Sequence, residues 1–184
     1  VSRTLGRSEM SLDALMVANP SLTVETKFIP LPEDFITQME NHPDVTLVAP
    51  KAENLPSLAS LSRLYAPSGK NSSIHGVIGI VPGVESEITR LNTTIIEGEC
   101  LSEDGVDELL ISESLARHLE IGVKGLVTIF GRNYTVAGIF DDRPLERIRE
   151  MNDELFLPSR LQATPGGVYL TQCWSDQIVI TDLK

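Results

Sequence analysis

The sequence predicts an α+β fold of mixed α/β character, built from two lobes. The first indication is an apolar run, a short amphipathic helix and a second apolar run, in that order, within 14–50. The second is a glycine-punctuated stretch over 95–140 that holds a short strand, a short helix and two alternating runs. Such pieces occur together in α+β domains. They predict a βαβ-containing lobe and a β-rich inserted lobe.

Composition and charge restrict the class of protein. The 184 residues are 41% hydrophobic, which is enough for a sizeable core. Lys and Arg number 15 against 26 Asp and Glu, which gives a net charge of -11. This charge repels phosphate backbones, so we predict no nucleic-acid partner. No apolar run approaches the roughly 20 residues of a membrane-spanning helix, and Val1 opens no signal-peptide pattern, so an excised soluble piece is expected.

The first lobe is predicted to comprise 1–83. A helix is expected to start after Pro32, because proline lacks the donor that a first helical turn leaves unpaired. Apolar runs over 14–18 and 45–49 flank this helix. A helix between two strands predicts a βαβ unit laid on one sheet. The apolar stripe of the helix consists of Phe35, Ile36 and Met39.

Two further strands of this lobe are predicted from β-branched runs. One is 74–81, which ends in a proline-glycine turn, and the other is 177–181, a final strand that 173–184 contributes. The stretch 51–71 is rich in Ser, Leu and Pro and has no steady period. We expect it to be a long loop with one irregular helix over 58–64.

The inserted lobe is predicted over 84–172. A strand over 108–111 leads into a helix that Ser112 caps and Gly122 ends. Two alternating runs joined by a glycine-containing turn predict a β-hairpin. The hairpin strands are 126–130 and 134–140, with the turn over 131–133, and they are followed by a helix over 145–152 and a turn or helical stub over 159–162.

The order of these pieces resembles the extracytoplasmic core domain of MacB/FtsX-type ABC transporter permeases. In that family a glycine, an acidic loop, a strand, a Ser-Leu-Ala helix, a hairpin and a valine-glycine strand follow one another. The match is best over 95–161, and a weaker one covers 32–50. Two residues depart from the family pattern: Glu99 replaces a basic residue, and Cys100 a larger apolar one. The matching positions are Gly98, 111–116, Gly122, Gly131 and 136–139.

The resemblance implies a non-catalytic domain that couples ATP-driven motion to an exported substrate or adaptor protein. It implies an extracytoplasmic location, on the periplasmic face of an inner or plasma membrane protein. The implied partners are membrane-embedded permease helices of the same chain, a cognate ATP-binding subunit or domain, and an adaptor or periplasmic protein. No cofactor and no catalytic, cofactor-binding or metal-binding residue is implied.

The candidate metal ligands are interpreted as structural. The three histidines are isolated, with no second His or Cys at helical spacing to share a metal. The acidic residues near 141 lack the spacing of a calcium loop, and Pro144 interrupts them, which favours a solvated strand exit. The residues concerned are His42, His75, His118, Asp141, Asp142 and Glu146.

Candidate nucleophiles also lack a catalytic pattern. The serines of the 51–71 stretch have no GxSxG elbow. Cys100 and Cys173 are the only cysteines and form no CxxC motif, and a disulfide or two separate thiols both remain open. Trp174 is interpreted as a core residue in preference to an exposed anchor.

Two other classes of function remain open at this stage. A stand-alone secreted module for a peptide or glycan would use 51–71 as its contact. An enzyme would depend on Asp141, Asp142 and Glu146, for which no acid/base partner is found. The parent reading frame discriminates among these classes, because a permease has an apolar stretch of about 20 residues before this chain and several after it.

Overall fold

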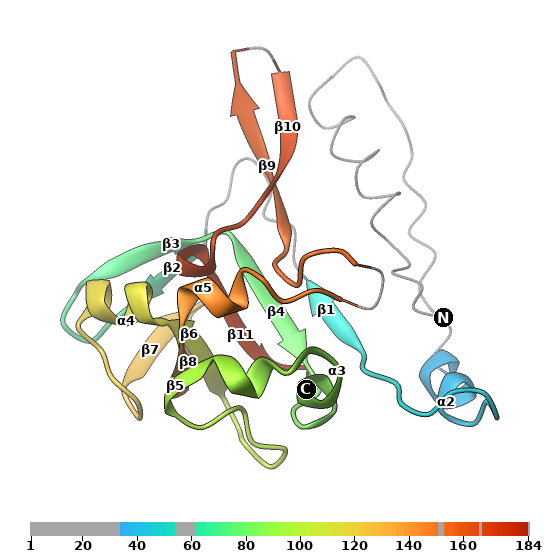
Figure 1. Ribbon diagram of the computed structural model, residues 1–184. Coiled ribbons are helices and arrows are strands. Elements are labelled where there is room, and N and C mark those ends of the chain that lie inside the picture. Colours follow the sequence, from blue (N-terminus) through green and yellow to red (C-terminus); the bar gives the residue numbers. More distant parts are fainter. Residues whose placement is uncertain (1–33, 54–61, 151–152, 166, 184) are drawn as a thin grey trace.

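The computed structural model describes residues 34–53, 62–150, 153–165 and 167–183. Within them, nine strands form one mixed sheet, with most neighbours antiparallel (Figure 1). In chain order they are β1 (Lys51–Glu53), β2 (Ser62–Tyr65), β3 (Asn71–Ile74), β4 (Gly76–Ile80), β5 (Ile95–Gly98), β6 (Glu108–Ser112), β7 (Leu126–Ile129), β8 (Arg132–Phe140) and β11 (Ile178–Asp182).

The helices are short, and α3, α4 and α5 lie around this sheet while α2 stands apart from it, so the predicted α+β class is confirmed (Figure 1). Among the described residues, no helix is long and apolar enough to cross a bilayer. A separate two-stranded hairpin, β9 (Ser159–Thr164) and β10 (Gly167–Gln172), projects from the rest. The helices are α2 (Phe35–Glu40), α3 (Val84–Thr89), α4 (Glu113–Leu119) and α5 (Asp142–Leu145), with the 3-10 turns η1 (Leu91–Thr94) and η2 (Ser175–Gln177).

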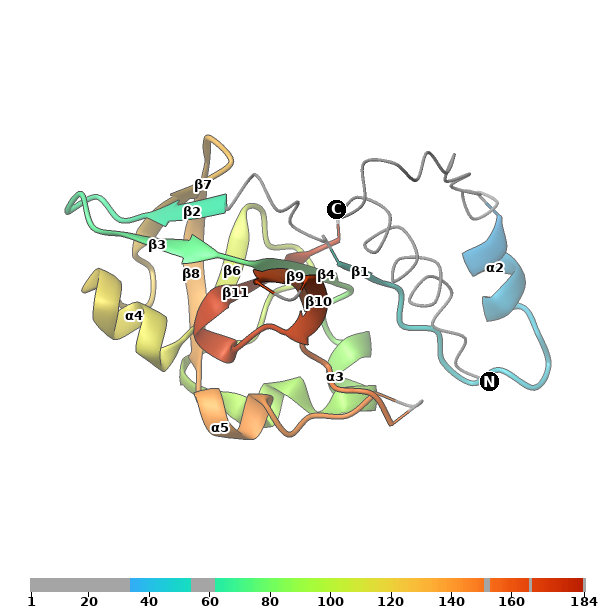
Figure 2. The ribbon, with the colours of Figure 1, turned by 90° about the horizontal axis from the view of Figure 1, so that it is seen from above.

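The sheet curls back on itself because one bent strand serves both of its sides. The strand order is β1-β4-β11-β6-β8-β7-β2-β3, with β5 beside β8. Only His75 separates β3 from β4, yet β3 pairs with β2 while β4 pairs with β11. The His75 amide donates to Gln177 O at 2.7 Å and so holds the bend against the end of η2, directly before β11. Figure 2 shows β3 running into β4 along this bend.

Two apolar clusters lie on the two faces of the curled sheet. Side chains alternate between the faces of a strand. Along β11, Val179 belongs to the first apolar cluster, and Ile178 and Ile180 belong to the second. Leu115 of α4 belongs to the first cluster, and Leu145 of α5 belongs to the second. The same strands therefore support both cores, and α4 and α5 each cover one of them.

The predicted strand–helix unit after residue 108 is confirmed, apart from its end. Ser112 Oγ accepts a hydrogen bond from a first-turn amide of α4 at 3.0 Å, as expected of a cap. The helix was predicted to end at Gly122, which is wrong. Glu120 instead takes the left-handed conformation, with φ of 55°, and the next amide, of Ile121, donates to Ala116 O.

The predicted hairpin is confirmed as β7 and β8, with a tighter turn than expected. Ile129 pairs directly with Arg132, so the loop is the two residues Phe130 and Gly131 and not 131–133. Both have positive φ, 54° and 76°. Positive φ at both positions is the mark of a type I′ turn, whose twist matches that of the strands.

The predictions for the first lobe are only partly confirmed. The helix after Pro32 is present as α2, but 45–49 is irregular and the strand β1 follows it. Pro50 has no amide for a ladder, so pairing begins after it. The predicted strand 14–18 lies outside the described residues. The predicted βαβ unit is therefore wrong for its second strand.

Three other local predictions differ from the structure. The end of the predicted helix 58–64 is the strand β2, and 54–61 lies outside the described residues. The predicted helix 145–152 is replaced by α5, because Asp141 caps a turn that starts earlier and tolerates Pro144 near its start. The predicted stub 159–162 is part of β9, where ladder pairing with β10 overrides the local pattern.

The division into lobes 1–83, with 173–184, and 84–172 stays a prediction. Strands of both ranges belong to one sheet, since β11 lies between β4 and β6. The predicted strand 74–81 is split by the bend into β3 and β4, and the predicted last strand is β11.

Two glycines allow β5 and β8 to approach closely. Gly98 pairs with Gly138 across the two strands. A Cβ on Gly98 would collide with Ala137 O, and one on Gly138 would collide with Glu99 O. Backbone atoms cannot move aside as a flexible side chain can, so this contact requires glycine at both positions.

Replacing Gly138 by alanine is expected to separate β5 from β8. The added methyl group meets backbone on the facing strand, so the free energy of unfolding should fall by about 2–4 kcal/mol. Urea denaturation measures the change. The control is Gly122→Ala, at an exposed position with no heavy atom within 4 Å of the new Cβ. Equal effects of the two substitutions would contradict the close approach.

Candidate functional site

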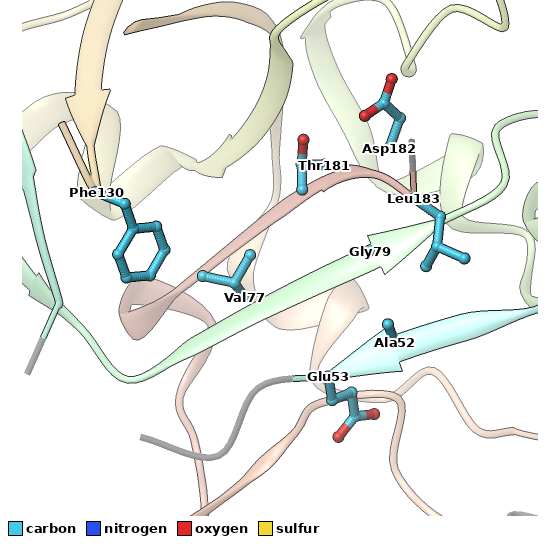
Figure 3. Close-up of a pocket in the computed structure, with 8 residues that line it drawn as sticks. All are labelled: Ala52, Glu53, Val77, Gly79, Phe130, Thr181, Asp182 and Leu183. Carbon is cyan, nitrogen blue, oxygen red and sulfur yellow. The ribbon is translucent and has the colours of Figure 1, made fainter. Parts of the chain in front are cut away.

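A pocket of about 350 Å³ opens where β1, β4 and β11 meet the β7–β8 turn (Figure 3). Val77, which helps to form its floor, also packs against the first apolar cluster. Gly79 adds a second stretch of floor without a side chain. The remaining lining residues are Ala52, Glu53, Phe130, Thr181, Asp182 and Leu183. The pocket is thus a continuation of the core that reaches the surface.

Phe130 forms one wall of the pocket from a strained backbone position. Its φ of 54° lies in the left-handed region, and its side chain is 66% exposed. An L residue with a Cβ loses roughly 1–2 kcal/mol in that conformation, and Gly, Asn or Asp are the usual occupants. The ring stands on the same side of β4 as Val77 (Figure 3). The fold therefore carries a costly aromatic residue at the edge of the pocket.

The two carboxylates of the lining have different surroundings. Glu53 is held by Lys51, whose Nζ lies 2.6 Å from Glu53 Oε1. Lys51 also pairs with Glu150 and lies 4.7 Å from the ring centroid of Phe156. Within the described part of the chain, no cation pairs with Asp182. Asp182 is therefore a lining residue whose negative charge is unpaired among the described residues.

A buried carboxyl group lies beside this ion-pair cluster. Glu85 of α3 is 4% exposed. Burial raises the pKa of Glu85 above its usual value, and the nearby positive charge of Lys51 opposes that rise. The cluster of Lys51, Glu53, Glu85 and Glu150 thus gathers charges of β1, α3 and the segment before β9 at one place.

The acidic residues singled out in the sequence make structural hydrogen bonds. Asp141 Oδ1 accepts from an α5 amide at 3.0 Å and caps that turn. Ser175 Oγ contacts Asp142 Oδ1 at 2.8 Å and Glu146 Oε1 at 2.9 Å. Asp142 Oδ2 also accepts from the Ser114 amide at 3.1 Å. The expected solvated strand exit is wrong for Asp142 and Glu146, because these groups join α4, α5 and η2.

Ser175 is the residue of this network that sequence reasoning missed. Ser175 is 2% exposed. It follows Asp142 by 33 positions in the sequence. No local pattern could have indicated the contact, because it depends on η2 folding back onto α5. Trp174 beside it is 59% exposed, so its expected core position is wrong. Cys173 and Ser175 point inward, and the intervening Trp174 therefore points outward.

The histidines lie apart from one another in the fold. His118 Nε2 lies 3.3 Å from Asn71 O, which links α4 to β3. His42 Nδ1 accepts from the Asp44 amide at 3.2 Å. At the β3–β4 bend, burial and then Arg160 lower the pKa of His75. No group of three or more His, Cys, Asp or Glu in the described ranges is placed to hold a metal ion.

Cys100 and Cys173 are two separate thiols. Cys173 is buried in the second apolar cluster, and burial raises its pKa to about 11. A thiol with such a pKa holds its proton at neutral pH and is a poor nucleophile. Cys100 is half-buried, with its sulfur 3.8 Å from Ser86 Oγ.

The chain is similar in fold to two solved structures. No family model matches the sequence, and no curated protein matches it. One solved structure is the periplasmic region of MacB from Actinobacillus actinomycetemcomitans, with 18% identity, a TM-score of 0.46, and coverage of 60% of this chain and 50% of that chain.

The other is the extracellular domain of the noncanonic ABC-type transporter YknZ from Gram-positive bacteria. Here the identity is 17% and the TM-score is 0.47, and the match covers 70% of this chain and 62% of that chain. The chain therefore spans less than two thirds of either structure. Domains of this kind are what the sequence resembles.

Removing the Ser175 hydroxyl is expected to destabilise the protein. Ser175→Ala leaves Asp142 and Glu146 without their shared partner, at a cost of about 1–3 kcal/mol in the free energy of unfolding. Ser114→Ala is the control, because that exposed residue contributes only its amide to the network. Urea denaturation of both variants measures the difference, and a Ser175→Ala protein as stable as the control would show that the network contributes nothing.

Glu85→Gln is expected to change how stability depends on pH. Because the pKa of Glu85 is raised in the folded protein, the folded chain binds this proton more tightly than the unfolded chain does. Wild-type stability should therefore fall, relative to the Gln variant, as pH rises above about 4.5 and through the higher folded pKa. Denaturation curves measured at a series of pH values between about 4.5 and neutral pH test this. The control is Glu87→Gln, at an exposed position of the same helix. A difference that does not grow with pH would contradict it.

Proposed function

We propose that the chain is a non-catalytic extracytoplasmic domain of an ABC transporter permease of the MacB/FtsX type. In this role it carries ATP-driven motion to an exported substrate or to an adaptor or periplasmic protein. Its partners are the membrane-embedded helices of the same permease and a cognate ATP-binding subunit or domain. No chemical step belongs to the domain itself.

The observation that carries this proposal is the physical role of the residues that resemble the family. Gly98 and Gly138 are the two glycines that permit β5 and β8 to approach. Ser112 caps α4, and Gly131 takes the positive φ of the hairpin turn. The residues that resemble the family therefore determine the fold of one part of the sheet. Proteins that share the order of these elements would need such residues at the same places.

The architecture suits a mechanical task. One sheet supports an apolar cluster on each face, so that β11 contributes to both cores. Close-packed interiors have low compressibility and pass a displacement on with little loss. A push on one edge of the sheet would reach the opposite edge through β4, β11, β6 and β8.

The Asp142–Ser175–Glu146 network speaks against the enzyme alternative. Its carboxyl oxygens accept hydrogen bonds from a buried hydroxyl and from a helix amide. These bonds satisfy groups that a general acid or base would present to a substrate. The alternative of a peptide-binding module is supported by the pocket, because Ala52 and Glu53, near the start of the predicted contact stretch 51–71, line that pocket.

Protease accessibility and co-purification in the natural host test the proposal. In spheroplasts, added protease should cut the domain within the full-length protein while a cytoplasmic marker stays intact. The solubilised full-length protein should co-purify with an ATP-binding subunit. A domain cut only after the membrane is permeabilised would contradict the proposed location, and purification without any ATP-binding polypeptide would contradict the proposed coupling.

A further inference from the structure

We propose that the pocket and the outer edge of β1 together bind an extended segment of a partner protein. The segment places one apolar side chain in the pocket and a Lys or Arg beside Asp182. This proposal goes beyond the permease proposal and does not rest on it, because it concerns a surface of the domain and is tested on the domain alone.

The interior of the pocket suits an apolar side chain. Val77 and Gly79 supply its floor, and Phe130 and Leu183 stand on two sides of it (Figure 3). Its volume of about 350 Å³ is at the small end of ligand pockets, which are mostly apolar with a few polar groups. An anchor side chain in such a pocket supplies most of the binding energy at a protein interface.

The strained position of Phe130 is an independent observation that points to binding. The two-residue turn needs positive φ at this position, which Asn or Gly provides without strain. The ring is 66% exposed, so core packing does not account for it. Strain retained beside a cavity, at an exposed side chain, favours a role of this residue in recognition.

The edge of β1 suits an extended backbone. In the described part of the chain, β1 pairs with β4 on one side only. Ala52, which faces Gly79 across that pair, is exposed and small, so the pocket is open toward the edge. An extended segment that adds to a sheet edge gains backbone hydrogen bonds and sends alternate side chains to one face.

The charge of the site favours a cationic segment. The lining contains no Lys or Arg. Within the described residues, none of the ion pairs includes Asp182. Glu53 is already held by Lys51, so Asp182 is the group left to attract a partner charge. The net charge of -11 on the chain draws cationic segments in the same way over longer distance.

Fluorescence anisotropy with a short labelled peptide tests the proposal. The peptide alternates Lys with Val and Leu, so that it can extend and present apolar side chains on one face. Saturable binding that weakens as salt rises is expected. Two matched peptides serve as controls: one has Glu in place of Lys, and one has Pro at alternate positions, which removes the amides needed for pairing. Both should bind at least about tenfold more weakly.

Two variants locate the binding on the protein. Phe130→Asn should weaken binding by about tenfold or more, since it removes the wall of the pocket. It should leave the melting temperature unchanged or raised, because Asn suits the turn. Gly79→Leu should fill the floor and weaken binding as well. The one tight contact of its Cβ is with the end of the Leu183 side chain, at 2.9 Å, and the backbone atoms Asp182 O and Leu183 Cα lie at ordinary contact distances of 3.6 and 3.7 Å. Gly122→Leu makes the same change at an exposed, open position and should bind normally.

Three results would overturn the proposal. The first is no saturable binding to the wild-type chain at concentrations up to about 1 mM. The second is unchanged binding by a folded Phe130→Asn protein. The third is equal binding of the Pro-containing peptide, which would exclude pairing with β1.

Discussion

The structure depends on one bent strand that pairs on two sides of the sheet. β3 and β4 form a continuous segment interrupted at His75, and this segment joins β2 to β11. Gly76, directly after the bend, lets the segment around Pro158 pack closely, since a Cβ there would collide with the Pro158 ring. The segment cannot separate from β2 or from β11 without breaking the hydrogen bonds of a ladder, so the sheet stays curled. The first apolar cluster lies on the inner face of the curl and the second on its outer face.

The curl also produces the pocket. It brings the end of β11 and the floor provided by β4 close to the β7–β8 turn, although these segments are far apart in sequence. The close approach of β5 to β8 adds a further constraint on the same sheet through Gly98 and Gly138. The packed sheet and the pocket are therefore two results of the same topology.

The sequence predicts features that depend on near neighbours. The Ser112 cap, the β7–β8 hairpin and the helix α2 each follow from signals within a few residues, and all three are present. The end of α4 differs from the prediction because Glu120 adopts the left-handed conformation that glycine usually occupies. There the ion pair of Lys70 with Glu120, at 2.7 Å, belongs to the tertiary structure and leaves no trace in local sequence.

Features that depend on distant contacts could not be predicted. His75 was interpreted as an isolated histidine, and nothing nearby in sequence shows that it marks the bend. The Ser175 contacts join residues about thirty positions apart. Phe130 carried no signal for a binding site, because an exposed aromatic residue in a turn acquires that meaning only from its backbone conformation and from the β4 residues beside it.

Native-state hydrogen exchange in increasing denaturant tests the central claim, that the curled sheet is one cooperative unit. If the bent strand closes the sheet, the slowest amides of β2, β4, β6, β8 and β11 should share one opening free energy, equal to that of global unfolding. A separate opening of lower free energy confined to β2, β3 and β7, with β4, β6 and β11 still protected, would contradict the closure.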